Sequence, residues 1–373
     1  MLAHQDPLKV FKTKLRNKGL MHKLTSRPTY GQDLDGTNFT KYRRKMLETL
    51  EVFSRTEVKR MERMKMCGQW LQFRECPDKH IRHLEDARFC KDRLCPMCNW
   101  RKSVGTHFDI FRIAHHMLHT EDSRGFCFLT LTVPNCALDE LSGTLKRLNT
   151  GFAKMIRRNA KMKKVVKGYF RSIEITYNEK TNTWHPHIHA VLSVKRSYFT
   201  GANYIKHSEW LDRWRRAYGD FNITQLNIKR MKYSNDDELC SAIGEVCKYT
   251  MKPAIYDIDD KEKRIQVLRS LKDQVKHFHL HQVGGEMWEY MKLLNIDPES
   301  MDTGVDRDIE HLKHCDVCGQ ELYKTWYAWA SNQYKLKYAE LVSESEKRWE
   351  SIEESSYILS ERLAIEHEAK SVN

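Results

Sequence analysis

The chain has 373 residues and a formal net charge of +14, with a sequence pI near 9.2 and a mean hydropathy of −0.70. No apolar run approaches about 18 residues, which excludes an evident membrane span, and the basic balance indicates a polyanionic partner, most simply nucleic acid. Because the N-terminus carries no apolar signal region, we expect a cytoplasmic protein. In such a protein we expect the eleven cysteines to be metal ligands or small buried residues rather than to form disulfides.

Residues 1–35 are rich in lysine and arginine and show little apolar patterning. We expect a disordered basic arm, which either touches phosphates or only adds solubility. From Asn38, a candidate helix cap, an apolar pattern of helical period runs through Tyr42 and Met46. It opens a helical and cysteine-rich region predicted over residues 36–118.

Five cysteines lie in this region: Cys67, Cys76, Cys90, Cys95 and Cys98. The last two form a Cys-x-x-Cys knuckle, whose tight turn lets both sulfurs bind one tetrahedral zinc ion. We expect the four zinc ligands to be Cys67, Cys90, Cys95 and Cys98. Cys76 or His80 could replace one of them, and the alternative to a zinc site is a set of reduced, unliganded cysteines.

The middle of the chain alternates helix and strand patterns after a first helix near residues 99–118. The predicted strands are Gly125–Pro134, Tyr169–Tyr177, His185–Leu192 and a short one over 224–229. The predicted helices cover about 137–161, 207–218 and 236–252.

The strand that contains His185, His187 and His189 carries the strongest signal, since alternation puts these three side chains on one face. The turn-rich residues 178–183 predict a hairpin that brings Glu174 of the preceding strand close to them. Two histidines and one carboxylate leave coordination positions open, which suits catalysis better than structure. The alternative is a surface strand that happens to be rich in histidine.

On the helix predicted over 236–252, Glu245 and Tyr249 are four residues apart and so share a face. Tyr249 could accept a phosphoryl group as nucleophile, and Glu245 could act as a base for water. Lys248 and Lys252, also four apart, could steady phosphate charge. Packing and solvation are the alternative roles for all four residues.

Residues 256–373 are predicted to be mostly helical, with a stretch over about 257–295 and a helical tail from about 325. Cys315 and Cys318 form a second Cys-x-x-Cys knuckle, half of a possible second zinc site. Its other ligands could be His311 or His314, or come from the histidines at 277–281. We expect the tail to pack on its own domain, and a dimerising helix, hence a homodimer, is the alternative.

Three motifs occur in a fixed order: the strand Leu129–Asn135, the pattern His185–His189, and Glu245 with Tyr249. This set resembles the motifs of HUH endonucleases, and more closely those of rolling-circle plasmid replication initiators that pair one tyrosine with a glutamate. The cysteine-rich segment before the first motif also resembles that family. The likeness covers roughly residues 60–255.

The resemblance implies an α+β fold, in which an HUH-type antiparallel sheet of about five strands, flanked by helices, forms a catalytic domain over residues 119–255. The cysteine-rich insertion would precede it, and the helical region would follow. His187 and His189 match the family's metal-binding pair, while Glu174 matches a third ligand by spacing alone. Tyr249 matches the nucleophile, and Glu245 the glutamate that replaces a second tyrosine.

The implied activity is nicking and joining of single-stranded or hairpin origin DNA with Mg²⁺ or Mn²⁺, through a 5′-phosphotyrosine link that leaves a 3′ hydroxyl primer. The sequence has no Gly-x-x-x-x-Gly-Lys-Ser/Thr phosphate loop, so a host helicase would unwind the plasmid and a host polymerase would extend the primer. The rival interpretations are a conjugative relaxase, a single-strand transposase, and a non-catalytic zinc protein that binds DNA.

Overall fold

A computed structural model describes residues 38–120, 124–247, 253–296, 305–306, 309 and 311–348. The predicted basic arm lies outside these residues. The described chain divides into two compact units. The first unit comprises residues 41–67, 89–120, 124–247 and 253–296, and the second comprises 38–40, 68–88, 305–306, 309 and 311–348.

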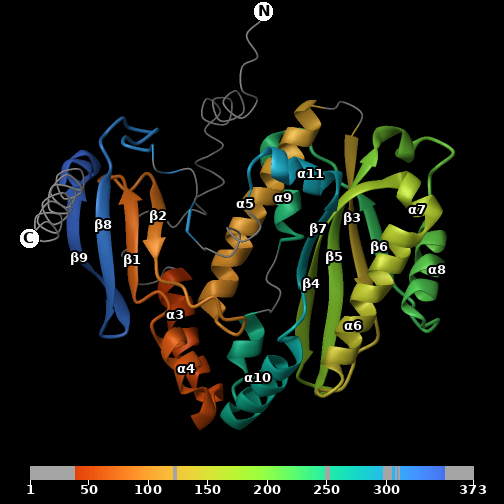
Figure 1. Ribbon diagram of the computed structural model, residues 1–373, viewed down its shortest axis with the longest axis horizontal. Coiled ribbons are helices and arrows are strands. Elements are labelled where there is room, and N and C mark those ends of the chain that lie inside the picture. The colour runs from red at the N-terminus through yellow and green to blue at the C-terminus, as the bar shows by residue number, and fades with distance from the viewer. Residues whose placement is uncertain are drawn as a thin grey trace, which may run out of the picture. The chain divides into compact units, whose positions relative to one another are not determined.

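A five-stranded antiparallel sheet organises the first unit (Figure 1). In spatial order its strands are β6 (Leu226–Arg230), β3 (Arg124–Thr132), β5 (Thr183–Lys195), β4 (Val166–Asn178) and β7 (His281–Gly285). The long hairpin β4–β5 lies near the centre of the sheet, and β3 pairs with β5 on the edge that β4 does not occupy. The predicted α+β class is confirmed.

Helices cover both faces of this sheet (Figure 1). One face carries α5 (Pro96–Thr120), α9 (Asp236–Gly244) and α11 (Glu286–Leu293), and the other carries α6 (Leu141–Phe152), α7 (Ala160–Val165) and α8 (His207–Tyr218). The remaining helices are α3 (Asn38–Thr49), α4 (Val58–Lys65) and α10 (Lys261–Val275), with 3-10 segments at Leu50–Val52, Arg55–Glu57, Arg196–Phe199 and Pro253–Asp257 and a π-helical segment at Ala153–Arg158. None of these helices, within the described part of the chain, is long and apolar enough to cross a membrane.

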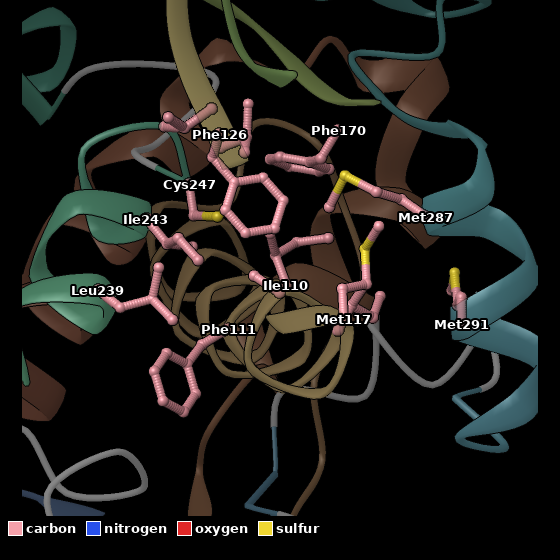
Figure 2. Packing of buried hydrophobic residues seen from close by; sticks show 14 of the residues in the cluster. Ile110, Phe111, Met117, Phe126, Phe170, Leu239, Ile243, Cys247, Met287 and Met291 are labelled. Carbon is pink, nitrogen blue, oxygen red and sulfur yellow. The ribbon is translucent and has the colours of Figure 1, made fainter. Parts of the chain in front are cut away.

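The core between the sheet and α5 positions the helix α9 (Figure 2). Phe126 of β3 and Phe170 of β4 point from the sheet toward Ile110 of α5, and Leu239 and Ile243 of α9 pack against the same helix. These side chains are almost fully buried. Their close packing fixes the end of α9, beyond which the candidate catalytic residues follow.

A four-stranded antiparallel sheet makes up most of the second unit, in the order β2 (Arg82–Ala87), β1 (Trp70–Glu75), β8 (Tyr323–Ala330) and β9 (Gln333–Leu341). The prediction of a helical tail from about residue 325 is therefore wrong as far as Leu341. Ser331 and Asn332 join β8 to β9 with φ of 51° and 61°, the two positive values that a tight type I′ hairpin turn requires.

The region after residue 255 also departs from the predicted, mostly helical extension. Helices α10 and α11 form as predicted, but β7 interrupts them and pairs with β4 at the edge of the five-stranded sheet. By its contacts this segment belongs to the first unit. The described residues from 305 on, which include the knuckle, β8 and β9, belong to the second unit.

Candidate active site

Glu174, His187 and His189 meet on one face of the five-stranded sheet. Glu174 on β4 lies directly opposite His187 on β5, and His189 is two residues further along β5. A period of two therefore puts all three side chains on one face. The Nε2 atoms of His187 and His189 lie 2.5 and 2.8 Å from the same Glu174 oxygen, Oε2. The hairpin thus brings together the three predicted ligands.

This donor set fits a divalent cation. Glu174 is 3% exposed, and burial of a carboxylate is costly unless a positive group or a metal ion neutralises it. Adjacent ligands of an octahedral site with bonds of about 2.1 Å lie about 3.0 Å apart. The His189–Glu174 distance of 2.8 Å is close to this value, and the His187–Glu174 distance of 2.5 Å is shorter. Both histidines are partly exposed, so an ion can reach the cluster from solvent.

Thr130 on β3 orients one of the histidines. It pairs across the sheet with His189, and its Oγ1 lies 3.2 Å from Nδ1 of that ring. When Nδ1 carries the proton and donates it to the Thr130 hydroxyl, Nε2 is unprotonated. Its lone pair then faces Glu174 and can bind a metal ion. Sequence reasoning misses this role of Thr130, because its position opposite His189 follows from the pairing of β3 with β5 and not from a local pattern. His185 lies outside the three-donor cluster, with its ring centroid 5.4 Å from that of His187.

The turn that follows α9 is fastened beside this cluster. Ser172 lies two residues before Glu174 on β4 and on the same face. Its hydroxyl donates a 2.7 Å hydrogen bond to the Val246 carbonyl, and both residues are buried. The chain just after α9 is therefore held to the strand that supplies the carboxylate. The sequence offered no signal for this contact.

Glu245 is exposed and directly follows Gly244, the last residue of α9. Of the helix predicted over 236–252, residues 236–244 form α9, and residues 245–247 form a turn. Tyr249, Lys248 and Lys252 lie outside the described residues. A helix face shared by Glu245 and Tyr249 therefore stays a prediction.

The first cysteine group has the composition that we expected. It comprises Cys67 after α4, Cys90 after β2, and Cys95 and Cys98 at the start of α5. The Sγ atoms of Cys67 and Cys98 are 3.4 Å apart, and the Cys90–Cys98 and Cys95–Cys67 pairs are each 3.5 Å apart. Four sulfurs around a tetrahedral zinc lie about 3.8 Å from one another, so the group fits zinc.

Crowding perturbs these thiols. Hydrogen bonding with the Cys90 thiol lowers the pKa of Cys67 well below its ordinary value, and burial raises the pKa of Cys95. A negative charge on one sulfur thus disfavours deprotonation of the neighbouring thiols. A divalent cation at the centre of the group removes that conflict, because it stabilises several thiolates at once.

A second group forms within the second unit from Cys76, His80, Cys315 and Cys318. The Cys76 sulfur lies 3.5 Å from both Nδ1 of His80 and the sulfur of Cys318, and Nδ1 of His80 lies 3.9 Å from the Cys315 sulfur. The backbone N–H of Gln320 lowers the pKa of Cys318 to about 7, which favours the thiolate. Three sulfurs and one imidazole also fit a tetrahedral zinc.

The residues that lie beside the second knuckle differ from the ligands that the sequence predicts for it. His311, His314 and the histidines at 277–281 do not join Cys315 and Cys318 among the described residues. Instead β1 pairs with β8, which sets Glu75 opposite Tyr323 and brings the turn after β1 to the knuckle before β8. The two residues that we considered as alternatives for the first group, Cys76 and His80, therefore belong to the second.

Residues 81–338 match the family model described as "Replication protein". The match contains the carboxylate–histidine cluster, Tyr249 and the second knuckle, and it begins after Cys67 and Cys76.

Curated relatives named "Protein rep" are similar over much of the chain. The protein of Streptococcus pneumoniae serotype 2 is 38% identical over 204 residues, which cover 54% of this chain and 63% of the relative. That of Staphylococcus aureus is 37% identical over 200 residues, 53% of this chain and 85% of the relative. That of Lactiplantibacillus plantarum is 32% identical over 276 residues, 72% of this chain and 86% of the relative. No solved structure matches the chain.

Proposed function

The chain belongs to the Rep family of replication proteins, and from this premise we propose that it initiates rolling-circle replication of a plasmid. In this proposal it is an HUH endonuclease and strand transferase that nicks and joins one strand of the origin. The observation that carries the proposal is the cluster of Glu174, His187 and His189 beside the fastened turn at Val246.

Chain geometry supports a role for Tyr249. This residue follows Val246 by three positions, and a chain spans at most about 3.6 Å per residue, so the two Cα atoms lie within about 11 Å of each other. Val246 itself is bonded to Ser172, which shares a strand face with Glu174. The nucleophile that the motif indicates therefore follows by three residues a carbonyl that is bonded to the strand of Glu174.

The reaction divides between the cluster and the tyrosine. A Mg²⁺ or Mn²⁺ ion held by Glu174, His187 and His189 would polarise the scissile phosphate and stabilise charge on its oxygens. The Tyr249 hydroxyl oxygen attacks the phosphorus and bonds to the 5′ phosphate as the bond to the 3′ oxygen breaks. The tyrosine gives up its proton and the departing 3′ oxygen gains one. The resulting 3′ hydroxyl primes synthesis.

Glu245 suits the step that ends a replication round. It is exposed and precedes Val246 directly, so its carboxylate can take a proton from water. Water activated in this way cleaves a second time without forming another covalent link, whereas a second tyrosine would form one. Lys248 and Lys252, close by in the sequence, would neutralise phosphate charge.

The other parts of the protein serve recognition in this proposal. Zinc in the two cysteine groups would stabilise small segments that bury little apolar surface themselves. The net charge of +14 favours origin DNA, either single-stranded or in a hairpin, as the partner. A host helicase and a host polymerase would supply unwinding and synthesis.

The deciding experiment mixes the protein with labelled single-stranded origin DNA and Mn²⁺ and detects a denaturant-resistant protein–DNA adduct. We expect an adduct from the native chain and none from Tyr249→Phe. Tyr204→Phe is the matched control, because it removes the same hydroxyl from a tyrosine that is 52% exposed and outside the cluster. An adduct that survives Tyr249→Phe would refute the assignment of the nucleophile. No adduct on any origin strand would favour the non-catalytic zinc protein that binds DNA.

A further inference from the structure

A third group of metal-ligating side chains lies away from both the sheet cluster and the cysteine groups. His115 and His119 are one turn apart on α5, and Asp236 is the first residue of α9. One ligand atom from each residue lies within 4.8 Å of the others. None of the three has a role in the proposed nicking reaction.

The spacing suits a shared ion better than a simple ion pair. His115 Nε2 and Asp236 Oδ2 are 3.4 Å apart, whereas a charge-assisted hydrogen bond measures about 2.7–2.9 Å. Nitrogen and oxygen ligands at about 2.0–2.1 Å from a tetrahedral ion lie about 3.3 Å from each other. The rings of His115 and His119 stack with centroids 4.0 Å apart, so both imidazoles turn to the same side of the helix.

The surroundings of His119 and Asp236 support the same conclusion. Nδ1 of His119 lies 2.8 Å from the His115 carbonyl, an acceptor, so this nitrogen donates and leaves Nε2 with its lone pair. Asn235, and not Asp236, caps α9, since the Asn235 side chain accepts from the Glu238 N–H. His115 is buried and His119 exposed, which leaves one side of the group open to solvent.

We propose that His115, His119 and Asp236 bind one divalent transition-metal ion, which fastens the first turn of α9 to α5. Two imidazoles and one carboxylate are suitable ligands for an ion of the zinc, cobalt or nickel kind. In the middle of α9, Nε2 of His107 already donates to the Cys240 carbonyl at 2.7 Å. The ion would thus complete a two-point attachment of the helix that packs on α5 in Figure 2.

The consequence for catalysis rests on the proposed function, whereas the binding site does not. Helix α9 ends at Gly244, directly before Glu245 and the fastened carbonyl of Val246. An ion that holds the start of α9 therefore helps to fix where the catalytic segment begins.

The test uses the full chain with zinc in its cysteine groups and Co²⁺ as the probe, and contains no DNA. The double variant His187→Ala/His189→Ala removes the sheet cluster. We expect this protein to bind one further Co²⁺ per chain by equilibrium dialysis, with visible d–d absorption and without the sulfur-to-cobalt charge-transfer absorption that exchange at the cysteines would produce. The unfolding temperature should rise with Co²⁺ concentration.

Adding His119→Ala or Asp236→Asn should weaken this Co²⁺ binding at least about tenfold and abolish the thermal shift, since each removes a ligand. His119 is exposed and Asp236 is partly exposed. Binding must be lost with either replacement, so the conclusion does not depend on the folding of one variant. His277→Ala, at an exposed histidine of the same unit outside the group, should bind Co²⁺ as before. No further Co²⁺, or a bound Co²⁺ that survives either replacement at native affinity, would overturn the proposal. Neither result depends on whether the protein nicks DNA.

Discussion

The hydrogen bond between Ser172 and Val246 gives the sharpest test of how the fold positions the proposed nucleophile. Ser172 is 2% exposed and Val246 0% exposed, and the bond measures 2.7 Å. Ser172→Ala removes the donor and leaves the buried carbonyl without it. Such a loss costs about 1–2 kcal/mol in the free energy of unfolding. The buried side chains of Val246 and Cys247 still hold the turn, so we expect a shifted turn in a folded protein.

The shift should matter more for chemistry than for stability. A misplacement of about 1 Å in a reacting group costs up to about a hundredfold in rate. We expect single-turnover adduct formation with origin DNA and Mn²⁺ to slow about 10- to 100-fold, which corresponds to about 1.4–2.7 kcal/mol in the activation barrier. The Mn²⁺ concentration for half-maximal rate should not change, because Glu174, His187 and His189 stay in place.

Ser193→Ala is the matched control. Ser193 lies on the neighbouring strand β5 and is also fully buried, but its hydroxyl has no hydrogen-bond partner among the described residues. We expect its free energy of unfolding to change by less than about 0.5 kcal/mol and its adduct rate to stay native. If Ser172→Ala forms the adduct at the native rate, or if Ser193→Ala slows it equally, the anchoring argument fails.

Three further predictions address the ligands and the packing. Glu174→Gln keeps the side-chain shape but removes the charge, so adduct formation should fall at least about a hundredfold while zinc content is unchanged; native activity would exclude the carboxylate as a ligand. Cys98→Ser and Cys318→Ser should each lower the zinc content by one ion per chain in elemental analysis, and an unchanged content would show that the corresponding group binds none. Hydrogen bonding with Lys272 lowers the pKa of Glu57 from 4.5 to about 2, so this contact stabilises the fold above pH 4.5 and is lost as the pH falls toward about 2. Lys272→Met should therefore reduce the free energy of unfolding by about 1 kcal/mol at pH 7, and urea titrations should show the difference shrinking toward pH 2; a difference independent of pH would contradict the contact.

The metal cluster could be predicted from sequence because its determinants are local. A short polar turn joins the two strands, and the alternation of His187 with Ile188 and Ala190 allows only one orientation of the strand. Buried aliphatic side chains must face the helices α6 and α8, so the histidines face the other way. The register that sets Glu174 opposite His187 then follows from the hairpin itself.

The second cysteine group could not be completed in this way because its partners are remote. Trp70 of β1 pairs with Ala328 of β8 across more than two hundred residues, and no local spacing reveals such a pairing. Apolar residues in 325–341 also recur at intervals of three and four, which predicts a helix. The missed signals were the aromatic-rich pattern Tyr323–Trp329 and the turn residue Asn332, which together favour a hairpin.

Both reactive parts of the proposed site are attached to one strand. Glu174 of β4 supplies the carboxylate, and Ser172 of the same strand holds the turn that leads to Tyr249. A displacement of β4 therefore moves the ligand and the anchor together and preserves their spacing. Substitutions in the layer of α6 and α8, on the opposite face of the sheet, should lower stability well before they alter that spacing. The turn after α9 is different, because a buried hydrogen bond from Ser172 to Val246 positions it on this strand while the buried side chains of Val246 and Cys247 keep it folded. Small changes there should therefore separate activity from folding.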